Sequence, residues 1–348
     1  MPISYSSFNS QLVNTPSFST PDYLQAFECY LCDLLDELDN NVRDLAKQVV
    51  LNGGKRIRPV LVFLCGSRNS EFAENLLKAS SVIELVHVAT LVHDDILDNA
   101  SIRRGNPTLH SLHSKHTSIL LGDALFSFAL EIATTFPDTT VCRIVAKATR
   151  ETCSGEIDQN LFVNDFEMSP DKYYSIIKNK TGALFSASCA IGAHLSGASS
   201  IVIDSVCGFG NSLGLNYQIY DDLVDTFGNK SSFDKTLGTD FASGKVTLPI
   251  IKLLESLSGD ERSSVVHDLS QKSENVDFLN YVRELFEKNN IHQACFDELQ
   301  KQLTISKSIA TNIPDTLLSQ NLLNFISSFD GKIDSLSKNL FPNFLALN

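Results

Sequence analysis

Apolar residues recur at helical spacing along most of this chain, whereas strict apolar–polar alternation is scarce. A period near 3.6 places apolar side chains on one face of a helix, and a half-buried strand needs a period of two. The first clear run contains Leu24, Phe27, Leu31, Leu34, Leu35 and Leu38. The spacing predicts an all-α fold, a large helical bundle around one core.

The same pattern predicts where the folded part begins. Residues 1–19 are rich in Ser, Asn and Thr, as in a flexible arm. Thr20-Pro21-Asp22 then starts a helix with a capping hydroxyl, a proline in the first turn and an early acid. No break in composition divides the rest, so we expect one domain over residues 20–348. Further periodic segments begin near Val60, Ala73, Thr117, Pro137, Pro170, Thr181, Ser200, Lys245, Val276 and Gln293.

The chain is acidic, with 28 Lys and Arg against 41 Asp and Glu and a net charge of −13. Nucleic-acid binding needs basic patches against phosphate, so we expect no nucleic-acid partner. The eight cysteines are scattered, which favours reduced thiols in a cytoplasmic protein. We find no signal peptide and no continuous apolar run of the roughly 20 residues that span a membrane. We therefore expect a soluble protein without a transmembrane segment.

The strongest chemical signal is the acidic motif Asp94-Asp95-Ile96-Leu97-Asp98, which follows an apolar helical run. On a helix, Asp94 and Asp98 lie one turn apart on the same face, and Asp95 lies about 100° around the axis. Like charges this close repel unless a cation lies between them. Mg²⁺ prefers carboxylate oxygens and completes its shell with water and phosphates.

The motif recurs at Asp221-Asp222-Leu223-Val224-Asp225, again after an apolar helical run. One acidic cluster is commonly a solvated helix end, but two with the same spacing favour a metal site. They lie far apart in the sequence, so the fold must place them. Facing each other, they would bind two or three Mg²⁺ ions around one diphosphate.

Two basic clusters complement these acids: Gly53-Gly54-Lys55-Arg56-Ile57-Arg58-Pro59 and Arg103-Arg104-Gly105. In an acidic chain, such local clusters favour anionic ligands. Pairing with surface acids is the alternative that these residues alone leave open.

Seven motifs occur in a specific order: GGKRIRP, LVHDDILD, RRG, Gly155-Glu156 with Gln159, Lys180-Thr181, YQIYDDLVD and GKVTLP. Together, over roughly residues 50–255, they resemble the trans-prenyl diphosphate synthase family, and most of all its long-chain polyprenyl members. The resemblance implies an all-α fold in which the two acidic motifs face each other across a deep central cavity. It also implies a homodimer.

The resemblance assigns roles residue by residue. It implies Mg²⁺ ligands at Asp94, Asp95, Asp98, Asp221, Asp222 and Asp225. It implies an allylic diphosphate site at Arg103, Lys180 and Lys245, with Lys235 as a later phosphate contact. It implies a pocket for isopentenyl diphosphate at Lys55, Arg58, His87 and Arg104. Thr181 and Gln218 would border the reacting allyl group and steady its charge.

The expected reaction is a head-to-tail prenyl transfer with farnesyl or geranylgeranyl diphosphate as the allylic substrate. Metal ions would neutralise the leaving diphosphate as the allylic C–O bond breaks. The double bond of isopentenyl diphosphate, held close by, would attack the allyl cation, and the adduct would lose a proton to the departing diphosphate. The product would be a longer trans-polyprenyl diphosphate.

Product length is expected to depend on the residues before the first motif. Ala89 and Thr90 are small where short-product members of the family often carry aromatic residues. The motif also lacks the two-residue insertion of many short-product bacterial members. We therefore expect a product of more than four isoprene units. Phe126 and Phe128 either form the floor of the tunnel or are ordinary core residues.

Three other functions stay open. A short-chain synthase would stop at farnesyl or geranylgeranyl diphosphate. A class I terpene cyclase shares the helices, acidic clusters and Mg²⁺, but needs no pocket for isopentenyl diphosphate, and it lines its cavity with aromatics, whereas this chain has no tryptophan. A non-catalytic subunit of a heteromeric synthase would usually lose one acidic motif, and both are intact here.

Overall fold

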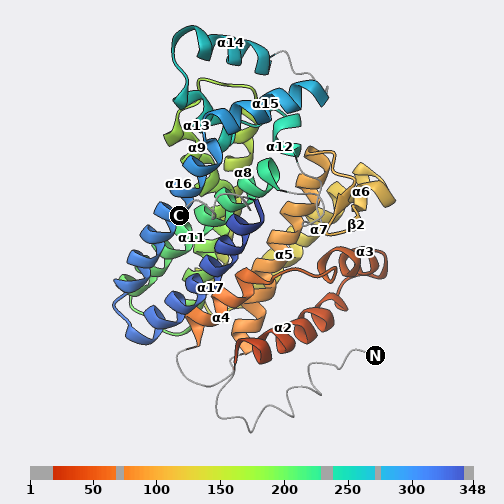
Figure 1. The fold of residues 1–348 in the computed structure, drawn as a ribbon. Coiled ribbons are helices and arrows are strands. Elements are labelled where there is room, and N and C mark those ends of the chain that lie inside the picture. Colours follow the sequence, from red (N-terminus) through yellow and green to blue (C-terminus); the bar gives the residue numbers. More distant parts are fainter. Residues whose placement is uncertain (1–18, 68–73, 229–237, 271–275, 341–348) are drawn as a thin grey trace. The chain divides into compact units, whose positions relative to one another are not determined.

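Helices account for almost all the regular structure of the computed structural model (Figure 1). The structure describes residues 19–67, 74–228, 238–270 and 276–340. Within these residues the elements are helical apart from one short hairpin. The all-α fold class is therefore confirmed, whereas the deep central cavity stays a prediction.

The described residues pack as two compact units. Unit 1 takes its residues from 1–150, 183–211 and 309–322, and unit 2 from 151–182, 212–308 and 323–348. The single domain expected over residues 20–348 stays a prediction. The division between units falls inside four helices: α8 (Thr140–Leu161), α11 (Ser200–Phe227), α16 (Ile291–Thr311) and α17 (Thr316–Leu340).

Unit 1 is built around α5 (Glu74–Leu97), which packs along α7 (Lys115–Thr134) (Figure 1). Because α5 carries apolar residues on all sides, neighbouring helices bury almost its whole length. It ends at the first acidic motif, so the core of unit 1 positions those aspartates. The other elements wholly in this unit are α2 (Thr20–Leu35), α3 (Asn40–Val50), α4 (Ile57–Gly66), β1 (Ile102–Arg103), β2 (Asn106–Pro107), α6 (Leu109–Leu112) and α10 (Ala183–Leu195).

The start of α2 differs from the prediction by one residue. The N-cap is Ser19 and not Thr20: the Ser19 hydroxyl accepts from the Asp22 N–H at 3.4 Å, and the Asp22 carboxylate accepts from the Ser19 N–H at 3.1 Å. This reciprocal pair needs an acid three residues after the cap, and only Ser19 has that spacing to Asp22. The helical pattern was expected to continue from Thr20 to Gly53-Gly54, and the structure divides this stretch into two helices, α2 and α3.

A small hairpin follows the first acidic motif. β1 and β2 pair antiparallel, and the two residues between them, Arg104 and Gly105, have φ of 50° and 74°. Two consecutive positive φ angles are typical of the tight turn that joins twisted strands. No strand was expected from the sequence, because two residues are too few to show a period of two.

Unit 2 contains a π-helical turn, η1 (Lys178–Gly182), which continues α9 (Pro170–Ile177). Glycines on two helices allow it to pack closely. A Cβ on Gly155 of α8 would lie 2.3 Å from the Lys180 nitrogen, and one on Gly214 of α11 would lie 2.6 Å from Gly182 Cα. Other elements of unit 2 are α12 (Thr239–Ala242), α13 (Leu248–Ser256), α14 (Gly259–Ser270) and α15 (Val276–Lys288).

Two helices among the described residues, α5 and α7, are long and apolar enough to cross a membrane by length and composition alone. Of the most apolar stretch, 72% is buried in α5 and 44% in α7. Burial of most of α5 accords with its place at the core of unit 1. The expected absence of a transmembrane segment stays a prediction.

Candidate functional site

The first acidic motif lies at the end of α5. The Asp98 N–H donates to the Asp94 carbonyl at 2.8 Å, which is a helical bond between residues four apart. Asp94 and Asp98 therefore lie on one face, as predicted. Asp98 is exposed, whereas Asp95 points inward and is 6% exposed.

Arg103 holds Asp95. The Arg103 Nε donates to Asp95 Oδ1 at 2.6 Å. Burial raises the pKa of Asp95, and the charge of Arg103 opposes that rise. The hairpin thus brings the arginine predicted to bind the allylic diphosphate onto the first acidic motif.

The same hairpin contacts the glycine-rich loop before α4. The Arg104 guanidinium donates to the Gly53 carbonyl, and Asn106 Nδ2 donates to Asn52 Oδ1 at 3.0 Å. A Cβ at Gly54 would lie 2.8 Å from Arg104 Nη1, so a glycine lets the arginine approach. The loop that carries Lys55 and the arginine of the RRG motif are therefore neighbours, although 51 residues separate Gly53 and Arg104.

His87 lies among arginines. Burial lowers its pKa well below the ordinary value, and the charges of Arg58, Arg104, Arg103 and Arg56 lower it further. The imidazole is therefore neutral at pH 7, and the guanidinium groups supply the positive charge around it. The structure thus brings together Arg58, His87 and Arg104 of the predicted pocket. Lys55 is exposed on the same loop.

Arg56 differs from the other cations of this loop, because its side chain is turned into the protein. It is 5% exposed and donates to Glu28, Glu84 and the Val50 carbonyl. Its φ of 46° is left-handed, a conformation that costs about 1–2 kcal/mol for a residue with a Cβ. In the sequence, Arg56 was one of the three cations expected to favour an anionic ligand, and the structure pairs it with acids, which was the alternative left open. No role was assigned to Glu28 or Glu84 from the sequence.

The second acidic motif lies near the end of α11 in unit 2. Asp221 is exposed, whereas Asp222 is 2% exposed. The Tyr173 hydroxyl donates to Asp222 Oδ2 at 2.7 Å, and Gln218 Nε2 donates to Oδ1 at 2.8 Å. Burial, with the nearby charge of Asp240, raises the pKa of Asp222 to about 8.

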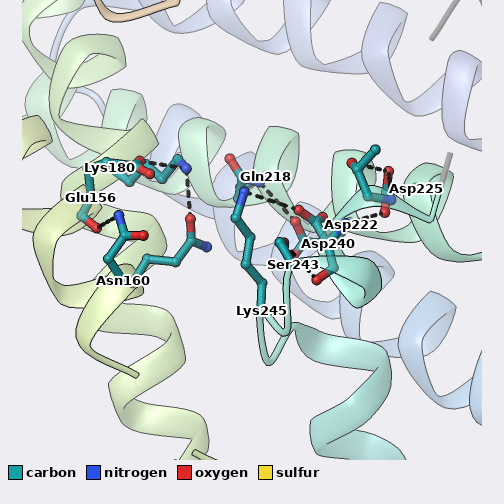
Figure 2. A network of polar contacts seen from close by, with 11 residues as sticks. Glu156, Asn160, Lys180, Gln218, Asp222, Asp225, Asp240, Ser243 and Lys245 are labelled. Atoms are coloured by element: carbon teal, nitrogen blue, oxygen red, sulfur yellow. Dashed lines mark hydrogen bonds and ion pairs between the residues drawn. The ribbon is translucent and has the colours of Figure 1, made fainter. Parts of the chain in front are cut away.

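The Asp225 carboxylate binds the start of α12, the short helix that carries Asp240 (Figure 2). Asp225 accepts from the Thr239 hydroxyl at 3.0 Å and from the Asp240 N–H at 3.1 Å. Burial and the charge of Asp225 raise the pKa of Asp240 to about 6, and Lys245 Nζ lies 3.5 Å from its carboxylate. Asp240 was missed from the sequence, although an acid five residues before Lys245 was a usable signal.

The π-helical turn directs consecutive side chains to two different helices. Lys180 Nζ lies 2.6 Å from Glu156 and donates to Gln159 at 2.7 Å, both on α8. The Thr181 hydroxyl donates to Gln218 on α11 at 2.6 Å. π-turns often occur at functional sites. Figure 2 shows Lys180 with Glu156 at one end of the polar network and the aspartates at the other.

The residues expected to determine product length lie in unit 1. Ala89 is fully buried, and the Thr90 hydroxyl donates to the His87 carbonyl at 2.7 Å. Phe128 is 7% exposed, and the ring of Phe126 lies 5.9 Å from that of His93. Both phenylalanines pack in the core, and their role as a tunnel floor stays a prediction. Lys235 lies outside the described residues.

The donors of both motifs fit Mg²⁺. In the described part of the chain, no three His, Cys, Asp or Glu side chains converge on a ready-made metal cage. Magnesium needs none, because it keeps several waters and takes phosphate oxygens. The pKa values of Asp222 and Asp240 are raised partly by neighbouring carboxylates, and a cation would relieve that repulsion.

Comparisons with known proteins agree with this chemistry. The polyprenyl synthetase family model matches residues 39–286. A short chain isoprenyl diphosphate synthase from Methanocaldococcus jannaschii is 33% identical over 239 residues, which cover 68% of this chain and 73% of that protein. Heptaprenyl diphosphate synthase component 2 from Geobacillus stearothermophilus is 34% identical over 250 residues, 69% of this chain and 77% of that one.

A solved structure shares the fold. It is a polyprenyl synthase from Caulobacter crescentus in complex with calcium and isoprenyl diphosphate, with 25% identity and a TM-score of 0.79. The match covers 94% of this chain and 97% of the other.

Proposed function

We propose the reaction from one premise: this chain belongs to the polyprenyl synthetase family and is a trans-prenyltransferase. It condenses isopentenyl diphosphate with farnesyl or geranylgeranyl diphosphate, head to tail, into a longer trans-polyprenyl diphosphate. The observation that carries this proposal is the basic cluster of unit 1, in which Arg104 donates to the Gly53 carbonyl of the glycine-rich loop and the charges of Arg58 and Arg104 act on His87. A second anionic substrate needs such a pocket, and a terpene cyclase does not.

Magnesium is the proposed cofactor. When bound, it neutralises the diphosphate that leaves the allylic substrate. The Caulobacter crescentus polyprenyl synthase was solved in complex with both calcium and isoprenyl diphosphate, which supports a divalent cation in this family fold. The proposed ligands are the aspartates of the two motifs: Asp94, Asp95, Asp98, Asp221, Asp222 and Asp225.

The chain's own residues bind and orient the two substrates. Arg103, Lys180 and Lys245 hold the allylic diphosphate, whose C–O bond breaks to give an allyl cation and free diphosphate. The oxygens of Thr181 and Gln218, already bonded to each other, turn their dipoles toward that cation. The double bond of isopentenyl diphosphate forms the new C–C bond, and the diphosphate takes the proton that the adduct loses.

The proposed product has more than four isoprene units. The support for this length is the small size of Ala89 and Thr90 before Asp94, where short-product members of the family often carry aromatic residues. One of the two relatives is a short chain synthase and the other a heptaprenyl synthase component, so they do not decide between long and short products. We also propose that the protein is cytoplasmic and forms a homodimer.

A second candidate is a subunit of a heteromeric synthase. The Geobacillus stearothermophilus relative, which is a component 2, favours it. In that case the purified chain would need another protein for full turnover.

Product analysis tests these proposals. The purified chain is incubated with Mg²⁺, labelled isopentenyl diphosphate and farnesyl diphosphate, and the hydrolysed alcohols are separated by length. We expect a ladder beyond four units, loss of turnover with a chelator, and recovery on adding Mg²⁺. A ladder that stops at three or four units would keep the reaction and contradict the long product. No elongation with any allylic primer would favour the subunit, or a cyclase if the primer alone were consumed.

A further inference from the structure

Arg56 is held by two carboxylates from different helices of unit 1. Its Nε and Nη2 donate to the two oxygens of Glu28 on α2, at 2.7 and 3.2 Å. Its Nη1 donates to Glu84 on α5 at 2.7 Å, and Nη2 also donates to the Val50 carbonyl at 2.8 Å. Glu28 therefore binds the guanidinium in a bidentate manner, the geometry that best orients an arginine side chain.

The bonds of the Arg56 side chain also fix the backbone conformation at the end of the glycine-rich loop. Arg56 has φ 46° and ψ 38° and immediately precedes α4. A left-handed residue with a Cβ persists only where its surroundings hold it. The bonds to Glu28, Glu84 and Val50 hold it from three sides. Lys55 immediately precedes Arg56, and Arg58 lies two residues after it in the first turn of α4. The directions of both side chains therefore depend on the backbone conformation of Arg56.

The two glutamates are not equivalent. The Glu84 side chain is 4% exposed, so removing it would leave a buried arginine poorly paired. The Glu28 side chain is 44% exposed, and its loss is better tolerated by the fold. Glu28 is therefore the residue through which the loop can be tested without unfolding the protein.

The helix α2 lies before residue 39, where the match to the family model begins. Its residue Glu28 contacts Arg56, which lies inside the matched segment at the end of the glycine-rich loop. We propose that α2, through Glu28, positions the loop that binds isopentenyl diphosphate, so that Glu28 and Arg56 are positioning residues for this substrate and not for the allylic one. This inference rests on the function proposed above.

Steady-state kinetics of two variants test the inference. With Mg²⁺ and farnesyl diphosphate saturating, we expect Glu28→Ala to raise the KM for isopentenyl diphosphate by about three- to tenfold. Glu28→Gln keeps one acceptor oxygen and should raise it less. In both, the KM for farnesyl diphosphate and kcat should stay within about twofold of wild type. Calorimetric titration with isopentenyl diphosphate alone should show the same ranking in Kd.

Glu37→Gln is the matched control, because it removes the same charge from an exposed residue shortly after α2. It should leave both KM values unchanged. An unchanged KM for isopentenyl diphosphate in Glu28→Ala would overturn the inference, as would an equal rise in both KM values. If the melting temperature of Glu28→Ala lies far below that of the wild type, the same comparison of the two KM values is made with Glu28→Gln.

The wild type separates this inference from the proposed function. If the wild type neither binds nor elongates with isopentenyl diphosphate, the proposed function fails and the inference fails with it. If the wild type is active and the Glu28 variants behave like it, only the inference fails.

Discussion

At the scale of single residues, the size of Ala89 is the feature with the most direct chemical consequence. Ala89 is fully buried on α5, and Asp94 follows five residues later. We predict that Ala89→Phe shortens the products to about three or four isoprene units, because a phenyl ring would block the proposed path of the growing chain past this residue. Separation of the hydrolysed alcohols by length measures this directly.

The substitution also overpacks a core, which costs about 1–3 kcal/mol, so the melting temperature must be measured beside the products. Ala46→Phe enlarges another fully buried alanine, on α3, and should leave product length alone. A folded Ala89→Phe with the wild-type ladder would show that no tunnel passes this residue.

Local spacing explains which site residues could be predicted. Asp94 and Asp98 share a face because a helix has a fixed period, so the sequence suffices for them. The different roles of the three cations in the glycine-rich motif could not be predicted in this way. Lys55, Arg56 and Arg58 look alike in the sequence, and only the tertiary partners Glu28 and Glu84 turn Arg56 inward.

At the scale of elements, the π-helical turn η1 carries Lys180 and Thr181 and depends on close packing by Gly155. We predict that Gly155→Ala raises the KM for the allylic diphosphate by about tenfold or more, because the added Cβ would lie 2.3 Å from the Lys180 nitrogen and must displace the turn. Steady-state kinetics with each substrate varied in turn measure the effect.

Gly208→Ala is the matched control. Gly208 lies on α11, and a Cβ there would meet nothing within 4 Å. Alanine should stabilise that helix by about 0.5–1 kcal/mol without a change in kinetics. If Gly155→Ala has normal KM values for both substrates, the turn does not position Lys180 for the diphosphate.

Most helices could be placed from apolar periodicity, and the segments begun near Ala73, Pro170 and Ser200 correspond to α5, α9 and α11. The interruptions could not be placed. The π-turn packs closely against glycines on other helices, which its own sequence does not reveal, and the hairpin after the first motif is too short to have a period. Both interruptions carry site residues, which local patterns alone do not predict.

At the scale of the whole molecule, α7 leaves large apolar side chains in water. Ile119, Leu120 and Leu130 are 44%, 68% and 39% exposed. Apolar side chains gathered on one exposed helix are typical of an interface, which supports the proposed homodimer. We predict that Leu120→Lys weakens self-association at least about a hundredfold, because burying an unpaired charge costs several kcal/mol.

Sedimentation velocity over a range of concentrations measures the association. Leu317→Lys is the control, because Leu317 is 55% exposed on α17. It should leave the molecular mass unchanged. A Leu120→Lys protein with the same mass as wild type at every concentration would exclude α7 as the contact between copies.

The turn η1 also shifts the phase of the helical stretch that contains it. A π-turn carries one residue more than the α-helical turn it replaces, and one residue corresponds to about 100° of rotation. The side chains of α10, which follows η1 directly, are therefore rotated relative to an uninterrupted continuation of α9. Deleting any single residue of the turn would regularise the helix and misalign every side chain that follows.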